Sequence, residues 1–194
     1  MRWWLKARRI APVLAPGLVT IVLALGLFAD TDASLVSWTV SNQTVPLLTF
    51  APLILAATLA LSLDSRLPEA ELTSTRRLPS LDMLLIVSAV SATLAAAWFA
   101  HQVTHADSTL VVGRNALFLT GLMLVARGFV GRGGIVVATG WVLIVILVGR
   151  RTPTEYFPWA VTGLPISTSR ATTAAIAAFV LGVLMTYLTA RKLP

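Results

Sequence analysis

LPEAELTSTRRLPSLD, residues 67–82, separates two apolar runs and decides how the chain is organised. The neighbouring runs, 45–63 and 83–100, approach the length of about 20 residues that a helix needs to cross the hydrocarbon core of a bilayer. The stretch between them carries five charged residues, namely Glu69, Glu71, Arg76, Arg77 and Asp82. Charge concentrated between two such runs predicts a connector at a membrane surface.

The composition of the whole chain also indicates a membrane protein. Of its 194 residues 57% are hydrophobic and 12% are charged, and its mean hydropathy is +0.84. Soluble domains carry roughly 25% charged residues. The chain has no cysteine, which excludes disulfides, thiolate metal ligands and a cysteine nucleophile. We predict one transmembrane domain over residues 1–194.

Six apolar runs predict six transmembrane helices, because a helix satisfies its own backbone hydrogen bonds in lipid. The predicted fold class is therefore all-α. The expected spans are approximately 11–28, 45–63, 83–100, 110–126, 135–148 and 171–188.

The distribution of basic residues predicts the orientation, since cytoplasmic segments carry an excess of lysine and arginine. With both termini in the cytoplasm, 11 of the 15 basic residues lie inside. The four that remain outside are Arg114, Arg150, Arg151 and Arg170. The high net charge thus favours a lipid bilayer as the partner and argues against nucleic acid.

Residues 149–170, between the fifth and sixth runs, are too apolar for a simple loop and too rich in proline for a span. Aromatic residues such as Trp159 favour the membrane interface. The segment predicts one or two short interfacial or re-entrant helices, with an ordinary loop on the headgroups as the alternative.

Arg114 and Asn115 enter the fourth run from the outer side. Because a charged side chain near a span is costly, such residues often have a function. Together with Trp159 they are candidates for a gate or substrate contact, with Asp107 as a possible pairing partner for Arg114. The alternative is that Arg114 extends to the headgroups.

His101 and His105 are four residues apart, a spacing that would place both imidazoles on one face of a helix. Asp107 is the nearest carboxylate, and the sequence has no HExxH pattern. We therefore predict histidines in an outer loop and no metal site.

The charged stretch at 67–82 has the polarity of a short helix. Pro68 suits the first helical turn. Glu69 and Glu71 would then lie at the positive end of the helix dipole, and Arg76 and Arg77 at its negative end. We predict a short helix across the cytoplasmic face of the membrane, with a solvated connector as the alternative.

Six spans, the basic start MRWWLKARRIAP and this charged segment resemble the membrane subunits of ABC-2-type transporters, including actinobacterial permeases. RNALFLTGLMLVARGFVG and the late element Phe157-Pro158-Trp159 are also similar to such permeases. The resemblance implies that 67–79 is a coupling helix. It assigns docking of an ATPase subunit to Glu69, Glu71, Thr73, Arg76 and Arg77.

The resemblance further implies a bacterial plasma-membrane exporter of an amphiphilic peptide, lipid or antibiotic, working with a second permease copy or a paralogue. The sequence has no G-x-x-x-x-G-K-[ST] phosphate-binding motif, so this chain is not itself expected to be an enzyme. It would need no cofactor of its own, since ATP and magnesium would be bound by the ATPase subunit. The alternatives are an ATP-independent secondary transporter and an immunity or assembly protein.

Overall fold

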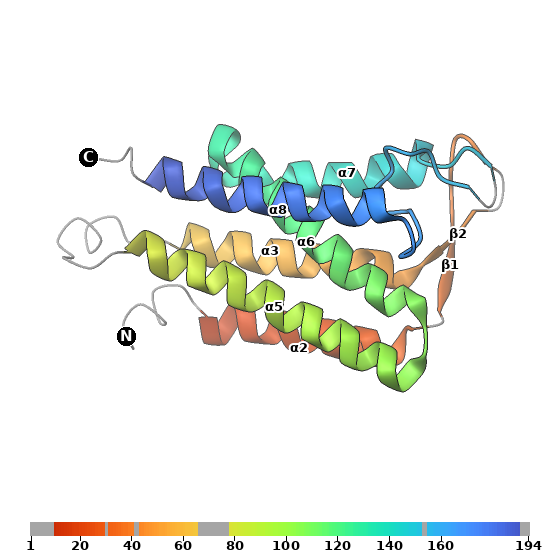
Figure 1. Cartoon of the computed structure of the whole chain (residues 1–194), viewed down its shortest axis with the longest axis horizontal. Helices are drawn as coiled ribbons and strands as arrows, with labels where there is room; N and C mark the ends of the chain where they lie inside the picture. Colours follow the sequence, from red (N-terminus) through yellow and green to blue (C-terminus); the bar gives the residue numbers. More distant parts are fainter. Residues whose placement is uncertain (1–9, 30, 41–42, 66–77, 153–154, 191–194) are drawn as a thin grey trace.

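The computed structural model describes residues 10–29, 31–40, 43–65, 78–152 and 155–190. Its long helices lie side by side along the long axis of the molecule and alternate in direction along the chain (Figure 1). One end of this bundle carries a two-stranded sheet and residues 149–168, and we call it the sheet end. The last residues of α3, the first residues of α5 and the turn between α6 and α7 lie at the opposite end (Figure 1).

The helices follow the apolar runs of the sequence. The first begins as a short π-helical turn, Ile10–Leu14, and continues as α2; a 3-10 turn, Leu47–Phe50, leads into α3. The main helices are α2 (Ala15–Leu27), α3 (Ala51–Asp64), α5 (Leu78–Thr104), α6 (Asp107–Val130), α7 (Gly134–Val148) and α8 (Ser169–Ala190).

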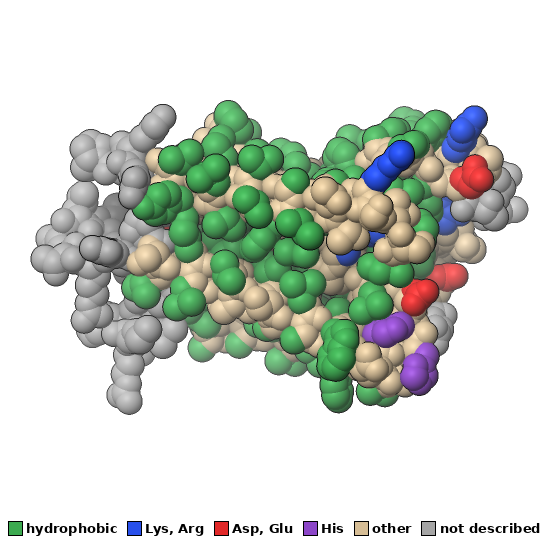
Figure 2. Space-filling view, viewed as in Figure 1, with side chains coloured by type: hydrophobic (Ala, Val, Ile, Leu, Met, Phe, Trp, Pro, Cys, Tyr) green, Lys and Arg blue, Asp and Glu red, His purple; other side chains and the backbone are tan. Residues whose placement is uncertain are grey.

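Within the described residues, five helical stretches are long and apolar enough to cross a membrane. Their outward surface is apolar too: large hydrophobic side chains are exposed along the helices, among them Trp98, Phe99 and Phe129. Figure 2 shows hydrophobic side chains covering the middle of the molecule, while the described charged and histidine side chains visible on this face gather at the sheet end. A bundle that is apolar outside is suited to lipid, so the prediction of a helical membrane protein is confirmed at this level.

One of the five stretches, Asp107–Val148, has 42 residues and contains two helices. After α6 the chain forms a 3-10 turn, Gly131–Gly133, in which Gly131 has a φ of +65°. Glycine adopts this φ without steric cost. The chain then folds back, so that Trp141 of α7 packs on Phe118 of α6 with their ring centroids 5.3 Å apart. The predicted fifth span, 135–148, thus corresponds to the 15-residue α7 packed beside α6.

The helix α6 lies at the centre of the core. Leu119, Met123 and Leu124 are almost fully buried, and α6 packs against α3, α5, α7 and α8. Its closest neighbour is α8, because glycines on both helices remove the side chains between them. A Cβ built at Gly121 would overlap the backbone of Ala178, and one at Gly182 would lie 2.6 Å from the carbonyl oxygen of Gly121. Small residues allow helices in membranes to approach in this way.

The all-α prediction is wrong in one part of the chain. Strands β1 (Asp32–Leu35) and β2 (Gln43–Pro46) pair antiparallel, with Ala33 opposite Val45. In β2, Gln43 and Val45 are buried while Thr44 is exposed, as expected of a strand with one face on the core. The strands are four residues each, too short for their alternation to stand out in the sequence.

The prediction of interfacial or re-entrant helices in 149–170 is also wrong. The described residues between α7 and α8 form turns and one isolated β-bridge between Arg150 and Tyr156. Ala160 and Val161 are nevertheless buried against the bundle. The segment is an irregular loop that folds onto the sheet end.

We expect Gly121→Ala to destabilise the bundle, because the new methyl group would meet the Ala178 backbone and force α6 and α8 apart. Overpacking of this kind costs about 1–3 kcal/mol. The measurement is the free energy of unfolding in mild detergent. Gly140→Ala is the matched control, because nothing lies within 4 Å of a Cβ built at Gly140. Equal stability of the two variants would contradict the close α6–α8 contact.

Candidate functional site

Arg114 and Asn115, predicted as a gate or substrate contact, lie two turns into α6 at the sheet end. Both are buried, with exposed fractions of 3% and 1%. Arg114 therefore does not extend into the headgroups, the alternative considered from the sequence. Its guanidinium group is inside the protein and must find its partners there.

The partners are backbone carbonyls of the loop between α7 and α8. Arg114 donates hydrogen bonds to the carbonyl oxygens of Val161 (3.0 Å), Leu164 (2.6 Å) and Pro165 (2.9 Å). Asn115 donates from Nδ2 to the carbonyl of Thr162 at 2.8 Å. Among the described residues, the side-chain partner of Arg114 is Asn115 Oδ1, and Asp107 stays exposed at the start of α6. We call Arg114 and Asn115 with these carbonyls the carbonyl clasp.

The carbonyl clasp supplies hydrogen-bond donors to buried backbone carbonyls of the α7–α8 loop. Backbone carbonyls buried outside regular structure need donors, or they cost free energy comparable to a lost hydrogen bond. A guanidinium group presents several N–H donors in a rigid fork and can serve three carbonyls at once. The clasp therefore fixes residues 161–165 on the end of α6.

Trp159 lies in the same loop but in a different set of contacts. Its ring meets Trp141 edge-on, with centroids 6.1 Å apart, and stacks on Phe157 at 6.3 Å. Together with Phe118 these aromatic rings attach the loop to α7 and α6. The structure thus brings Arg114 and Asn115 together and places Trp159 in a neighbouring aromatic cluster.

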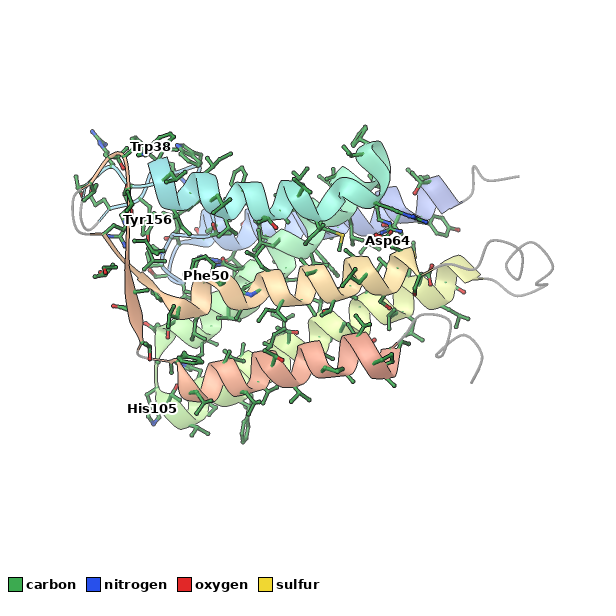
Figure 3. The ribbon with its side chains drawn as sticks, turned by 180° about the vertical axis from the view of Figure 1, so that it is seen from behind. Trp38, Phe50, Asp64, His105 and Tyr156 are labelled. Carbon is green, nitrogen blue, oxygen red and sulfur yellow. The ribbon has the colours of Figure 1, made fainter. Side chains whose placement is uncertain are left out.

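A second arginine, Arg150, organises the edge of the sheet end. Its Nη2 donates to the Thr44 carbonyl at 2.7 Å and to the Tyr156 hydroxyl at 2.9 Å. The guanidinium carbon also lies 4.7 Å from the centre of the Tyr156 ring. These contacts join β2 to the α7–α8 loop. Figure 3 shows Trp38, Tyr156 and His105 at this end of the molecule and Asp64 at the other.

A cavity of about 200 Å³ lies between these elements. Its walls come from β2, the turn before α3, the start of α6, the end of α7 and residues 162–165. Most lining residues are apolar; the polar ones include Gln43, Arg150, Tyr156 and Thr162. None of these four was predicted as a site residue. The available signal was Arg150 itself, which together with Arg114 is an exception to the expected excess of basic residues on the cytoplasmic side.

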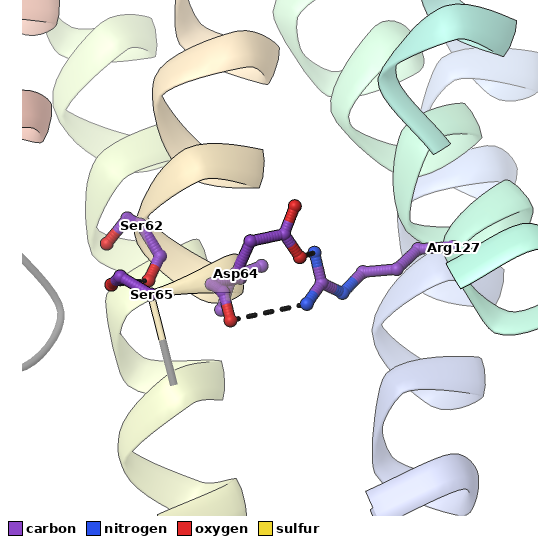
Figure 4. A network of polar contacts seen from close by, with 5 residues as sticks. Ser62, Asp64, Ser65 and Arg127 are labelled. Atoms are coloured by element: carbon purple, nitrogen blue, oxygen red, sulfur yellow. Dashed lines mark hydrogen bonds and ion pairs between the residues drawn. The ribbon is translucent and has the colours of Figure 1, made fainter. Parts of the chain in front are cut away.

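The opposite end of the bundle has its own polar contact (Figure 4). Arg127, near the end of α6, forms an ion pair with Asp64 at the end of α3, with 2.5 Å between Nη1 and Oδ1. Its Nη2 also donates to the Leu63 carbonyl at 3.2 Å. Arg127 thus links the end of α6 to the end of α3.

The predicted docking residues lie next to this link in the sequence, between α3 and α5. Glu69, Glu71, Thr73, Arg76 and Arg77 are outside the described residues. So is the predicted helix at 67–79 except for its last two residues, Leu78 and Pro79, which belong to α5. Their assignment stays a prediction.

The two histidines lie in the last turn of α5 and directly after it. His101 belongs to α5, not to a loop as predicted, and its Nδ1 lies 3.1 Å from the Ala106 carbonyl oxygen. His105 has a φ of +56° and ends the helix. Within the described residues, no group of three or more histidine, aspartate or glutamate side chains is arranged to hold a metal ion.

The fold is that of a helical membrane protein, with helices long and apolar enough to cross a bilayer. Its sheet end contains a cavity with polar lining residues, and its opposite end contains the ion pair between Arg127 and Asp64. No protein-family model, curated protein or solved structure matches the chain.

We expect Arg114→Met to loosen the α7–α8 loop, because three buried carbonyls lose their donor. Each unsatisfied buried group costs about 1–3 kcal/mol, and removal of the buried charge offsets part of this, so we expect a loss of about 2–4 kcal/mol. Unfolding in detergent measures the loss, and faster hydrogen exchange in 157–165 localises it. Arg170→Met, at an exposed position of the same end, is the control and should change stability little. Unchanged exchange in 157–165 would contradict the clasp.

Proposed function

We propose that the chain is a six-pass membrane subunit of an ATP-driven transporter of the ABC-2 type, an exporter in a bacterial plasma membrane. Its 66–77 connector docks an ATPase subunit in the cytoplasm, on the same side as both termini. The ATPase subunit binds ATP and magnesium. A second copy of the chain or a paralogue completes the translocation path, and the cargo is an amphiphilic peptide, lipid or antibiotic.

The observation that supports this proposal most is the pair of polar links on α6. At one end, Arg127 holds Asp64, the last residue of α3 before the connector. At the other end, Arg114 and Asn115 hold residues 161–165. Arg114 and Arg127 are 13 residues apart on the same helix, which at 1.5 Å per residue corresponds to about 20 Å of α6 between the two links.

Through this arrangement, a displacement of the connector can be transmitted across the bundle to the α7–α8 loop. Displacement of the end of α3 acts on α6 through the ion pair, and a hydrogen-bonded helix moves as a rigid element. The carbonyl clasp then transfers the motion to the α7–α8 loop. A subunit driven from outside the membrane needs such a connection, because its ATPase partner contacts the cytoplasmic face alone.

The proposal predicts six passages, with α6 and α7 crossing separately. The chain has no cysteine, so single-cysteine variants can be labelled without background. Ser167→Cys should react with a membrane-impermeant maleimide in intact cells. Arg132→Cys, in the turn between α6 and α7, should react only after permeabilisation. Both side chains are exposed, so burial does not explain a difference. Labelling of Arg132→Cys in intact cells would contradict the proposed topology.

The proposal also predicts capture of an ATPase through the connector. The tagged chain, extracted from its native host in mild detergent, should bring down a protein with a G-x-x-x-x-G-K-[ST] motif, identified by mass spectrometry. Changing Glu69, Glu71, Arg76 and Arg77 together to alanine should reduce its recovery at least about tenfold, which corresponds to about 1.4 kcal/mol of binding free energy.

The matched control changes two acidic and two basic residues at the sheet end to alanine, namely Asp32, Glu155, Arg151 and Arg170. All four are exposed, so this variant removes the same charges from the other end of the bundle. It should still capture the ATPase. If the wild-type chain stays folded and captures no such protein, the transporter proposal fails, and the ATP-independent alternatives take its place.

A further inference from the structure

The cavity at the sheet end is lined by buried polar atoms that have no partner in the described part of the chain. Gln43 lines it and is 1% exposed, and among the described residues neither its Nε2 nor its Oε1 has a hydrogen-bond partner. Leaving a buried polar group unpaired costs about 1–3 kcal/mol, and here one side chain has both a donor and an acceptor unpaired. A ligand that supplies both partners would recover this free energy.

A second lining residue, Thr162, offers a further polar group. It is 2% exposed, and its Oγ1 has no hydrogen-bond partner within the described ranges. Its backbone is fixed, because its carbonyl accepts the hydrogen bond from Asn115 in the carbonyl clasp. The Thr162 hydroxyl is therefore held in place before any ligand arrives, and a preorganised site loses less entropy on binding.

The remaining lining limits the size and charge of a ligand. The cavity of about 200 Å³ is somewhat larger than the engineered cavity of about 150 Å³ that binds benzene. Val45, Leu48, Val111, Val145 and Ile146 give it apolar walls, and the described lining holds no aspartate or glutamate that would attract a cation. The guanidinium group of Arg150, which also lines it, already donates to the Thr44 carbonyl and the Tyr156 hydroxyl. A small, mostly apolar molecule fits this space.

The hydrogen-bonding groups of Gln43 narrow the chemical class of the ligand further. A side-chain amide presents N–H and C=O in one plane and on the same side, so it can donate and accept at once. A carboxylate would supply no donor to Oε1, and an ammonium group would supply no acceptor to Nε2. An uncharged amide whose own N–H and C=O lie on the same side satisfies both atoms.

We propose that this cavity is a binding site for a small, uncharged amide of this geometry, a lactam or a primary amide, with Gln43 as its recognition residue. Two hydrogen bonds pair the ligand amide with Gln43, Thr162 Oγ1 makes a third contact, and the apolar walls cover the hydrocarbon part. The site does not depend on the transporter proposal, since it requires neither an ATPase nor a second subunit.

The test titrates the purified full chain in detergent with ε-caprolactam and with N-methylcaprolactam, following the melting temperature. The two probes share a ring and a carbonyl, but the second has no N–H. It is also the more apolar probe, so partition into the micelle favours it and works against the expected result. We expect ε-caprolactam to bind at least about tenfold more tightly, because the N-methyl probe leaves Gln43 Oε1 buried and unpaired.

Gln43→Met keeps the length of the side chain and removes both polar atoms. This variant should melt at a higher temperature than the wild type without ligand, and ε-caprolactam should no longer raise its melting temperature. Gln102→Met, at an exposed position of α5, is the matched control and should bind like the wild type. Equal affinity for the two probes, no binding of either, or full binding by Gln43→Met would each overturn the proposal, the second showing a cavity that takes water only.

Discussion

The structure depends on the burial of one positive charge. Arg114 brings a guanidinium group into the protein interior, and no described carboxylate forms an ion pair with it. Burying this charge would be costly if its N–H donors were unpaired. Three carbonyls of a single loop receive those donors, and Asn115 serves a fourth. The same hydrogen bonds thus offset the desolvation of the guanidinium group and the desolvation of the carbonyls. The loop has no helix or strand of its own to satisfy its backbone, so its shape follows from where Arg114 lies.

The sequence was sufficient for the features that repeat over many residues. Apolar runs of membrane length predict the helices, and they do so well because lipid allows few other structures. Arg114 and Asn115 stand out because polar residues next to an apolar run are rare.

The sequence was insufficient where distant segments meet. β1 and β2 are short, and each is a strand because it pairs with the other. The local sequence of either strand does not predict this pairing. The loop at 149–168 is rich in aromatic residues, and that composition suggested interfacial helices. Hydrogen bonds from α6, 47 to 51 residues away along the chain, hold it in an irregular form instead. Gln43 and Thr162 were missed for the same reason, since they become neighbours only when β2 and the loop fold onto the helices.

The close approach of Gly121 and Gly182 has a consequence for how the protein is made. Because α8 follows α6 and α7 in the chain, α6 is synthesised before its nearest neighbour. The contact between the two glycines cannot form until α8 has also been synthesised. A chain whose synthesis stops before residue 169 therefore leaves the glycine face of α6 without its partner helix.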